Sequence, residues 1–193
     1  DMQYTRRDWR NRNQIKTPDG LRWISIPVHN ADRVAARQRI DATRVADPNW
    51  SRQHLELFHH CYRRAAAFEP VIAWLQPLFR ALADEPLLSV INLGLLKAIA
   101  GRLDLATPIR RTSDYLADAE IEDLDRTERI IRLCRAAGAD RYLSGPAART
   151  YLDEAAMAKA GIAVAWMDYS GYPPYPQPWG AFAPNVSIVD LLF

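Results

Sequence analysis

Residues 125–169, DRTERIIRLCRAAGADRYLSGPAARTYLDEAAMAKAGIAVAWMDY, decide the fold class of this chain. In their first part, apolar residues recur at the spacing of one helix face, namely at Ile130, Leu133, Cys134 and Ala137. Asp125 and Glu128 have the spacing of a capping box, and Gly138 stands where a helix would end. The pattern predicts one complete amphipathic helix.

The rest of this stretch predicts a strand, a turn, a second helix and a second strand. We expect a short strand over 141–144, a sharp turn at Gly145-Pro146 and a strand buried on both faces over 162–167. The second helix should end near Gly161, and its buried stripe should comprise Ala148, Tyr151, Leu152 and Ala155. Parallel strands need a connection of about a dozen residues or more, which a helix supplies in a right-handed crossover. The sequence therefore predicts an α/β fold, with a parallel or mixed sheet and flanking helices.

The turn Ser144-Gly145-Pro146-Ala147 is a candidate anion site. In α/β sheets, ligands usually bind beyond the carboxyl ends of the strands, where amides at a helix start can hold a phosphate or carboxylate. Glycine permits close approach of a ligand, and proline suits the first helical turn. The alternative is a simple tight turn, because the motif is too short for a glycine-rich fingerprint.

The composition is that of an ordinary globular protein. With 193 residues, 49% of them hydrophobic and 25% charged, the chain can bury a core. We expect one α/β domain over 1–193, with a helical insertion or subdomain at 50–105. A net charge of only +2 does not indicate nucleic acid or an anionic membrane as a partner. Cys61 and Cys134 fall on apolar helix faces and fit free thiols better than a disulfide framework.

The longest hydrophobic region is too short to cross a membrane, because Pro86, Asn92 and Lys97 interrupt it. The sequence also shows no signal peptide. We therefore expect a cytoplasmic protein without membrane insertion. Because the chain starts with Asp1 and stops at Phe193 within a hydrophobic segment, we expect it to be a piece trimmed at both ends.

Residues 1–28 predict a hairpin preceded by a basic and aromatic segment. Pro18-Asp19-Gly20 has turn chemistry between two extended runs, 13–16 and 22–28. Before the turn, arginines and amides surround an indole ring, in the order Gln3, Arg6, Arg7, Trp9, Arg10, Asn11, Arg12 and Asn13. Such a mixture can hold a phosphate or a nucleotide by charge-assisted hydrogen bonds and stacking. The alternative is a solvated basic face.

A helix should begin with Ser51 as its cap. It contains or adjoins three histidines, His54, His59 and His60. Metal-binding histidines on a helix are spaced three or four residues apart, whereas the spacings here are five and one. We therefore expect no metal site.

Two further helices follow, both strongly apolar. The helix over 69–82 should bend or break at Pro77. In the helix over 86–103, Asn92 needs a hydrogen-bond partner if it is buried. Residues 108–112 should form a strand that returns to the sheet.

The tail combines prolines with aromatic residues. Prolines recur too often between 169 and 180 for a helix. Tyr175 and Gln177 are candidates for binding a sugar ring or a base, on a platform with Tyr172, Trp179 and Phe182. The alternative is an ordered loop whose rings cover the core. Ser187 should cap a last helix, with Asp190 returning the cap.

These motifs together resemble the WbqC-like protein family of bacteria. The resemblance is found at Asp1, Gln3, Trp9, Asn11-Arg12-Asn13 and 23–28, at Gly138-Ala139-Asp140 and 142–145, and at Tyr175-Pro176-Gln177, Phe182, Pro184 and 187–192. It implies a transferase in the synthesis of bacterial surface polysaccharide, such as O-antigen, or of related metabolites. It assigns no catalytic residue, and we expect the family's opening strand, loop and helix to be missing before Asp1.

The first functional hypothesis is an enzyme that binds a nucleotide or nucleotide-linked sugar and transfers an acyl, aminoacyl or nucleotidyl group. Its candidate substrate-binding residues are Gln3, Arg6, Trp9, Asn11, Arg12, Asn13, Ser144, Gly145, Tyr151, Tyr175 and Gln177. Asp1, Asp153 and Asp190 are candidate catalytic acids, although positioning and stabilisation by arginine could suffice. The sequence indicates no particular cofactor.

The second hypothesis is a non-catalytic binding or assembly protein of the same pathway, acting through the same pocket or the apolar helices. A third is RNA binding through the basic segment, which a steep dependence of affinity on salt would reveal.

Overall fold

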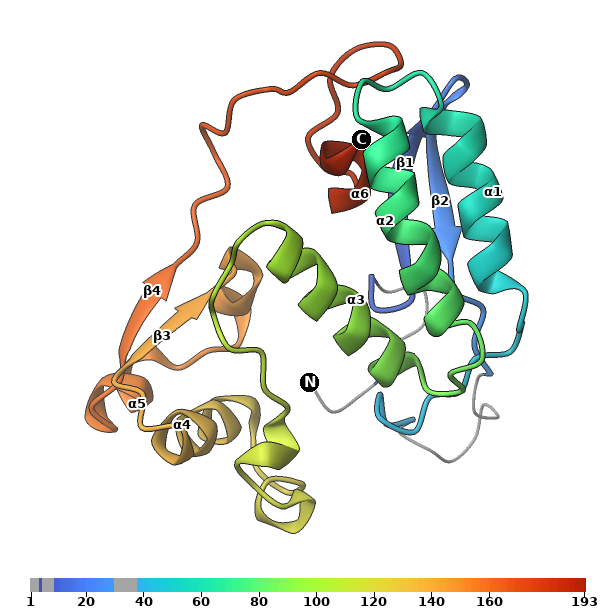
Figure 1. Ribbon diagram of the computed structural model, residues 1–193. Coiled ribbons are helices and arrows are strands. Elements are labelled where there is room, and N and C mark those ends of the chain that lie inside the picture. Colours follow the sequence, from blue (N-terminus) through green and yellow to red (C-terminus); the bar gives the residue numbers. More distant parts are fainter. Residues whose placement is uncertain (1–3, 5–8, 30–37) are drawn as a thin grey trace. The chain divides into compact units, whose positions relative to one another are not determined.

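The computed structural model describes residues 4, 9–29 and 38–193 (Figure 1). Contacts within the chain divide it into two compact units. Unit 1 consists of Asp1–Thr107 with Pro174–Phe193, and unit 2 consists of Pro108–Pro173. The single domain over 1–193 and the helical insertion at 50–105 remain predictions.

Unit 1 contains the antiparallel hairpin that the sequence predicts. β1 (Arg12–Thr17) and β2 (Gly20–Ser25) pair so that Gln14 lies opposite Trp23. Gly20 has a φ of 106°, a conformation that glycine adopts without strain, and Thr17 Oγ1 donates to the Gly20 carbonyl at 2.8 Å. These features close the turn.

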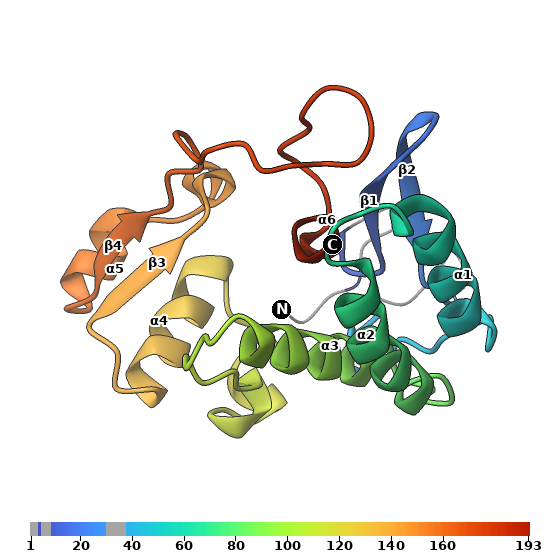
Figure 2. The same cartoon turned by 45° about the horizontal axis from the view of Figure 1, so that its top comes forward.

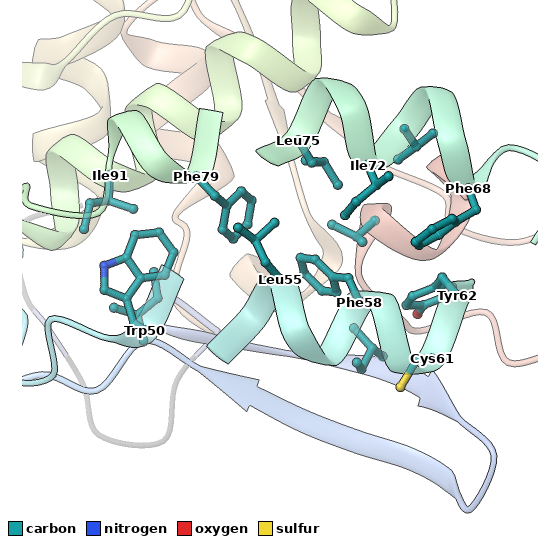
Figure 3. Packing of buried hydrophobic residues seen from close by; sticks show 14 of the residues in the cluster. Trp50, Leu55, Phe58, Cys61, Tyr62, Phe68, Ile72, Leu75, Phe79 and Ile91 are labelled. Carbon is teal, nitrogen blue, oxygen red and sulfur yellow. The ribbon is translucent and has the colours of Figure 1, made fainter. Parts of the chain in front are cut away.

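Two helices, α1 (Trp50–Tyr62) and α2 (Phe68–Ala81), supply most of the core of unit 1. Figure 3 shows Leu75 and Phe79 of α2 directed toward Phe58 of α1. The rings of Phe58 and Phe79 meet edge to face, with centroids 5.7 Å apart. Ile15 of β1 is fully buried in the same cluster. Because burying one such side chain stabilises by about 1.5–3 kcal/mol, this cluster fixes the hairpin to the helices.

Local details of these helices differ from the prediction. Ser51 does not cap α1, because the helix begins one residue earlier and the Ser51 hydroxyl donates to the Phe79 carbonyl at 2.7 Å. α2 is continuous through Pro77, so the predicted break does not occur. Leu75 and Phe79, on either side of the proline, are both buried, and their packing outweighs the hydrogen bond that proline removes.

A third helix, α3 (Leu88–Arg102), is apolar as predicted, although most of it is only partly buried. Asn92 finds its partner, since its Nδ2 donates to the Arg10 carbonyl at 2.8 Å. Residues 108–111 have no regular structure and lead into η1 (Thr112–Asp114), so the strand predicted over 108–112 is wrong. The segment is largely exposed and starts with a proline, so it lacks both a buried face and a full set of amide donors.

The C-terminal segment belongs to unit 1. The Ser187 amide donates to the Gln14 carbonyl at 2.7 Å, and α6 (Ile188–Leu192) lies against β1 (Figure 2). Ser187 caps α6 as predicted. Asp190 does not return the cap, because its carboxylate accepts a hydrogen bond from Tyr62 instead.

Unit 2 contains the predicted parallel crossover. After η2 (Asp118–Glu120) come α4 (Arg126–Ala136), β3 (Arg141–Ser144), η3 (Pro146–Thr150), α5 (Glu154–Lys159) and β4 (Ala163–Trp166). β3 and β4 pair in parallel. Asp125 caps α4 as predicted, with Oδ1 accepting from the Glu128 amide at 2.8 Å.

The second half of the crossover departs from the prediction. A 3-10 helix, η3, precedes a short α5, where a single helix is expected. The chain breaks there because Leu152 turns into the core of unit 2 while Asp153 starts a new helix, accepting from the Ala156 amide at 3.0 Å. β4 is exposed at Ala163 and partly buried after it, so the prediction of a strand buried on both faces is wrong.

The described residues form a mixed α/β structure, which confirms the predicted class. Their strands do not join in one sheet: one two-stranded sheet is antiparallel and the other is parallel. Cys61 and Cys134 are buried free thiols, as predicted. Within residues 4, 9–29 and 38–193, no helix has the length and apolar character needed to span a membrane.

Candidate functional site

A pocket of about 180 Å³ opens in unit 1 between the hairpin and the helices, and we call it the hairpin pocket. Its walls are predominantly apolar. The residues that line it are Trp9, Arg10, Asn11, Arg12, Asn13, Ile24, Ile26, Trp50, His54, Phe58, Leu75, Phe79, Asn92, Leu95, Ile99, Ser187, Ile188 and Val189. Segments far apart in the sequence therefore meet here, which is typical of ligand sites.

Two amide side chains fasten the segment 9–13 to the rest of the pocket. Asn11 Nδ2 donates to the Ile26 carbonyl at 3.0 Å, and the Ile26 amide donates back to the Asn11 carbonyl at 2.8 Å. From α3, Asn92 Nδ2 donates to the Arg10 carbonyl at 2.8 Å. The conformation of this segment is thus fixed by hydrogen bonds to two other elements.

Arginine and tryptophan alternate at the edge of the hairpin pocket. The Arg12 guanidinium lies 4.1 Å from the centroid of the Trp23 ring, and that of Arg10 lies 5.4 Å from the Trp9 ring. The Trp9 side chain is 77% exposed. Partial burial lowers the pKa of Arg10 below its ordinary value. Stacked guanidinium groups beside an apolar hollow suit a phosphorylated ligand that carries a ring.

His54 is a pocket residue that the spacing argument missed. Its Nε2 lies 3.0 Å from the Ser25 carbonyl, and its ring packs against Trp50 and Phe79. Desolvation lowers the pKa of His54, an effect that the bond to Ser25 only partly opposes. The ring is therefore neutral at pH 7. Its place on the buried face of α1, one helical turn after Trp50, was the available signal.

Asp190 lies in a buried polar cluster next to the pocket wall. Tyr62 donates to Asp190 Oδ2 at 2.8 Å, and burial together with this carboxylate raises the pKa of Tyr62. Burial also raises the pKa of Tyr175, and the charge of Asp190 adds to the effect. Asp190 is 1% exposed. Its side chain therefore links α6 to α1 rather than facing solvent.

The aromatic tail residues are largely engaged with their own loop. Gln177 donates to the Ala183 carbonyl at 3.0 Å and accepts from the Ala183 amide at 2.8 Å. Gln177 Nε2 also lies 3.2 Å from the Tyr175 hydroxyl, and the Tyr175 ring packs edge to face on Phe182. These contacts match the alternative of an ordered loop.

In unit 2, the turn after β3 has little that is specific to a ligand. Gly145 has an ordinary φ of −70°, and Ser144 is buried. η3 is a 3-10 helix of 5 residues, so it offers few aligned amides to an anion. A Cβ at Gly145 would lie 3.4 Å from the Tyr169 hydroxyl, which is close to an ordinary contact.

Tyr151 and Asp153 line a second hollow in unit 2, of about 430 Å³, near the starts of α4 and α5. The Asp153 carboxylate caps α5, and the Asp153 amide donates to Thr127 Oγ1 at 3.1 Å. The Tyr151 ring lies under the Arg126 guanidinium at 5.0 Å. Each polar group here has a role in holding the two helix starts together.

The structure thus gathers some of the predicted site residues and separates others. Trp9, Asn11, Arg12 and Asn13 line the hairpin pocket, and Tyr175, Gln177 and Asp190 form a cluster in the same unit. Ser144, Gly145, Tyr151 and Asp153 lie in unit 2. Asp1, Gln3 and Arg6 lie outside the described residues. In the part of the chain that is described, no group of three or more His, Cys, Asp or Glu side chains is arranged for a metal ion.

Comparison with known proteins adds the family. The chain is 43% identical over 194 aligned positions to an uncharacterized protein of Mycobacterium tuberculosis, Rv1507c, and the match covers 100% of this chain and 80% of that protein. No solved structure matches the chain. The family model described as WbqC-like protein family matches residues 1–193. The chain therefore belongs to the WbqC-like protein family.

Proposed function

We propose that this chain is a transferase of bacterial surface-polysaccharide synthesis, for example of O-antigen, or of related metabolites. It holds a nucleotide-linked sugar at the hairpin pocket and transfers an acyl, aminoacyl or nucleotidyl group. The observation that supports this most directly is that the segment 9–13, with the predicted binding residues Trp9, Asn11, Arg12 and Asn13, lines one mainly apolar pocket. The pathway is implied by the family resemblance.

The charges and rings at the pocket suit such a ligand. A guanidinium stacked on an indole, as in Arg12 over Trp23, presents its N–H groups at its edge, the geometry that recognises phosphate oxygens. The exposed Trp9 ring offers a surface on which a base can stack. The apolar interior, lined by Ile24, Leu75 and Leu95, then receives the ring of the sugar.

Of the predicted acids, Asp190 has the clearest connection to this pocket. Ser187 and Val189, which line the pocket, are on the same short segment, and the Tyr62–Asp190 hydrogen bond ties that segment to α1. We therefore assign Asp190 to positioning this wall. Asp153 remains a proposed acid whose carboxylate also caps α5.

A thermal-shift screen against nucleoside diphosphates, nucleotide sugars and coenzyme A thioesters tests the proposal. A ligand at a hundred times its Kd adds about 2.7 kcal/mol, which should raise the unfolding midpoint by roughly 5–10 °C. We expect one class of nucleotide to do so. Absence of a shift with all of them would contradict the transferase proposal.

The site is tested by replacing Arg12 with alanine, with Arg22→Ala as the matched control. Both arginines lie on the hairpin, but Arg22 does not line the pocket. Loss of one charge-assisted contact to phosphate should weaken nucleotide binding roughly 10- to 100-fold in Arg12→Ala. Equal weakening in both variants would show that the nucleotide responds only to the charge of the hairpin.

A non-catalytic assembly protein is the second candidate, supported by the exposed leucines of α3 and the residues after it. Leu96 is 56% exposed and Leu105 is 58% exposed. A protein partner in the pathway would cover such leucines. If Leu96→Glu abolishes product formation in cells whereas Arg12→Ala does not, the assembly function is favoured.

A further inference from the structure

Three polar side chains of the hairpin pocket share one property: each directs an N–H group to a backbone carbonyl. All three line the pocket. The bonds are Asn11 Nδ2 to Ile26 O at 3.0 Å, Asn92 Nδ2 to Arg10 O at 2.8 Å, and His54 Nε2 to Ser25 O at 3.0 Å.

A carbonyl oxygen can only accept, so these bonds fix the orientation of each amide and the tautomer of the imidazole. What remains on each side chain is an acceptor, namely Oδ1 of Asn11, Oδ1 of Asn92 and Nδ1 of His54. None of the three atoms makes a hydrogen bond to a described residue. Asn11 Oδ1 is also fully buried, and such an acceptor is costly to leave without a donor.

The charged groups at the pocket have one sign. The titratable or charged side chains that line it are Arg10 and Arg12, from the segment before and at the start of β1, and His54 from α1. Among the described lining residues, α2, α3 and α6 contribute no charged group and no element contributes a carboxylate. A cationic ligand group would thus meet two arginines without a counter-charge.

We infer that the hairpin pocket takes a neutral hydrogen-bond donor attached to an apolar ring, that is, a hydroxyl or an unprotonated primary amine. An acceptor-only group would leave the pocket acceptors unpaired, and an ammonium ion would be repelled by Arg10 and Arg12. The identity of the ring as a sugar rests on the proposed function. On that basis, the pocket holds the hydroxyl or amine of the sugar that receives the transferred group. An amine binds after losing its proton to water and keeps its lone pair for attack.

Two fragments that differ only in donor capacity test the inference on the unaltered protein. Cyclohexanol donates and accepts, whereas cyclohexanone only accepts, and a pocket of about 180 Å³ suits one such ring. We expect millimolar cyclohexanol to shift the methyl NMR signals of Ile24, Leu75 and Leu95. Cyclohexanone should bind roughly 3- to 10-fold more weakly, the ratio that one neutral hydrogen bond supplies. Equal binding of the two fragments would overturn the inference.

A third fragment, cyclohexylamine, separates the neutral amine from the ammonium ion. Between pH 7 and 9 it is mostly protonated, and its neutral fraction rises about tenfold per pH unit. Its affinity should rise accordingly, whereas that of cyclohexanol should stay constant because Arg10, Arg12 and the neutral His54 keep their charges. An amine affinity that is flat or falls over this range would show that the ammonium ion binds.

Variants locate the effect. Asn92→Leu removes one acceptor, and His54→Gln replaces another, so in both the preference for cyclohexanol should fall toward one. His60→Gln, on the exposed side of α1, should leave it unchanged. The thermal midpoint of each variant is measured alongside, and the comparison of fragments in the unaltered protein does not depend on any variant folding. A preference that survives both Asn92→Leu and His54→Gln would place the discriminating acceptor elsewhere and contradict the inference.

None of these fragments carries a phosphate or a base. The fragment experiment therefore succeeds or fails independently of the nucleotide screen. If the nucleotide screen fails while cyclohexanol is preferred, the transferase proposal is lost and the pocket chemistry stands.

Discussion

The hairpin pocket of unit 1 and the turn after β3 in unit 2 are both predicted ligand sites, yet the structure builds them differently. In the pocket, side chains from the hairpin, α1, α2, α3 and α6 converge, and several polar atoms are left with acceptor capacity. At the turn, Ser144 and Gly145 have only local contacts and ordinary backbone angles. A sequence motif read as a site therefore gains weight when distant segments complete it.

The two predicted acids that the structure describes show the same contrast. Asp190 is buried and receives a hydrogen bond from Tyr62, which is distant in sequence. Asp153 is exposed and bonds to Ala156, its own helix. Replacing Asp190 should thus disturb the arrangement of unit 1, whereas replacing Asp153 should weaken one short helix.

The largest effect is expected in the core that supports the pocket. Phe58→Ala should lower the free energy of unfolding by about 3–5 kcal/mol, because it leaves a cavity beside Phe79 and removes part of the pocket wall. Urea unfolding measures the change, and cyclohexanol binding should be lost. Met157→Ala, in the buried cluster of unit 2, is the control. Loss of cyclohexanol binding in that control would show that the two regions are not independent.

The buried hydrogen bond between α1 and α6 should have the next largest effect. Tyr62→Phe leaves the Asp190 carboxylate without its donor and should destabilise the protein by about 1–3 kcal/mol in thermal or urea unfolding. Tyr172→Phe changes a hydroxyl on a ring that is 66% exposed and should stay within about 0.5 kcal/mol. Similar values for both variants would mean that the Tyr62 hydroxyl contributes nothing to stability.

A smaller effect is expected in the pH dependence of stability, through His54. Its pKa is lowered on folding from the ordinary value of 6.5, so below that value the unfolded chain binds more protons than the folded one. Stability should therefore fall as the pH drops from 7 to 5. His54→Gln should flatten this slope, while His60→Gln should not. A slope unchanged in His54→Gln would show that His54 does not become protonated on unfolding.

The smallest effect on stability is expected at the turn of unit 2. Gly145→Val should change the free energy of unfolding by less than about 1 kcal/mol, because φ is −70° and the new Cβ meets only the Tyr169 hydroxyl at 3.4 Å. If nucleotide binding is nevertheless abolished while the fold is kept, the turn is a ligand site after all. Unchanged affinity would leave the hairpin pocket as the site.

Local signals predicted local structure well. The hairpin around Asp19-Gly20, the Asp125 cap of α4 and the parallel crossover from β3 to β4 each depend on neighbouring residues, and each is confirmed. Predictions that depended on distant partners did less well. The strand over 108–112 is absent, and Ser51 bonds to Phe79 rather than capping α1.

The amino-acid sequence by itself determined the α/β class, the order of the main elements and the family, because periodicity, turn residues and caps act over a few positions. It also marked the segment 9–13 as a binding candidate. Only the tertiary structure decided that His54 and Asn92 belong to the same pocket and that each keeps an acceptor there. Which atom of a side chain remains for a ligand depends on carbonyls brought close by folding, and no local pattern contains that information.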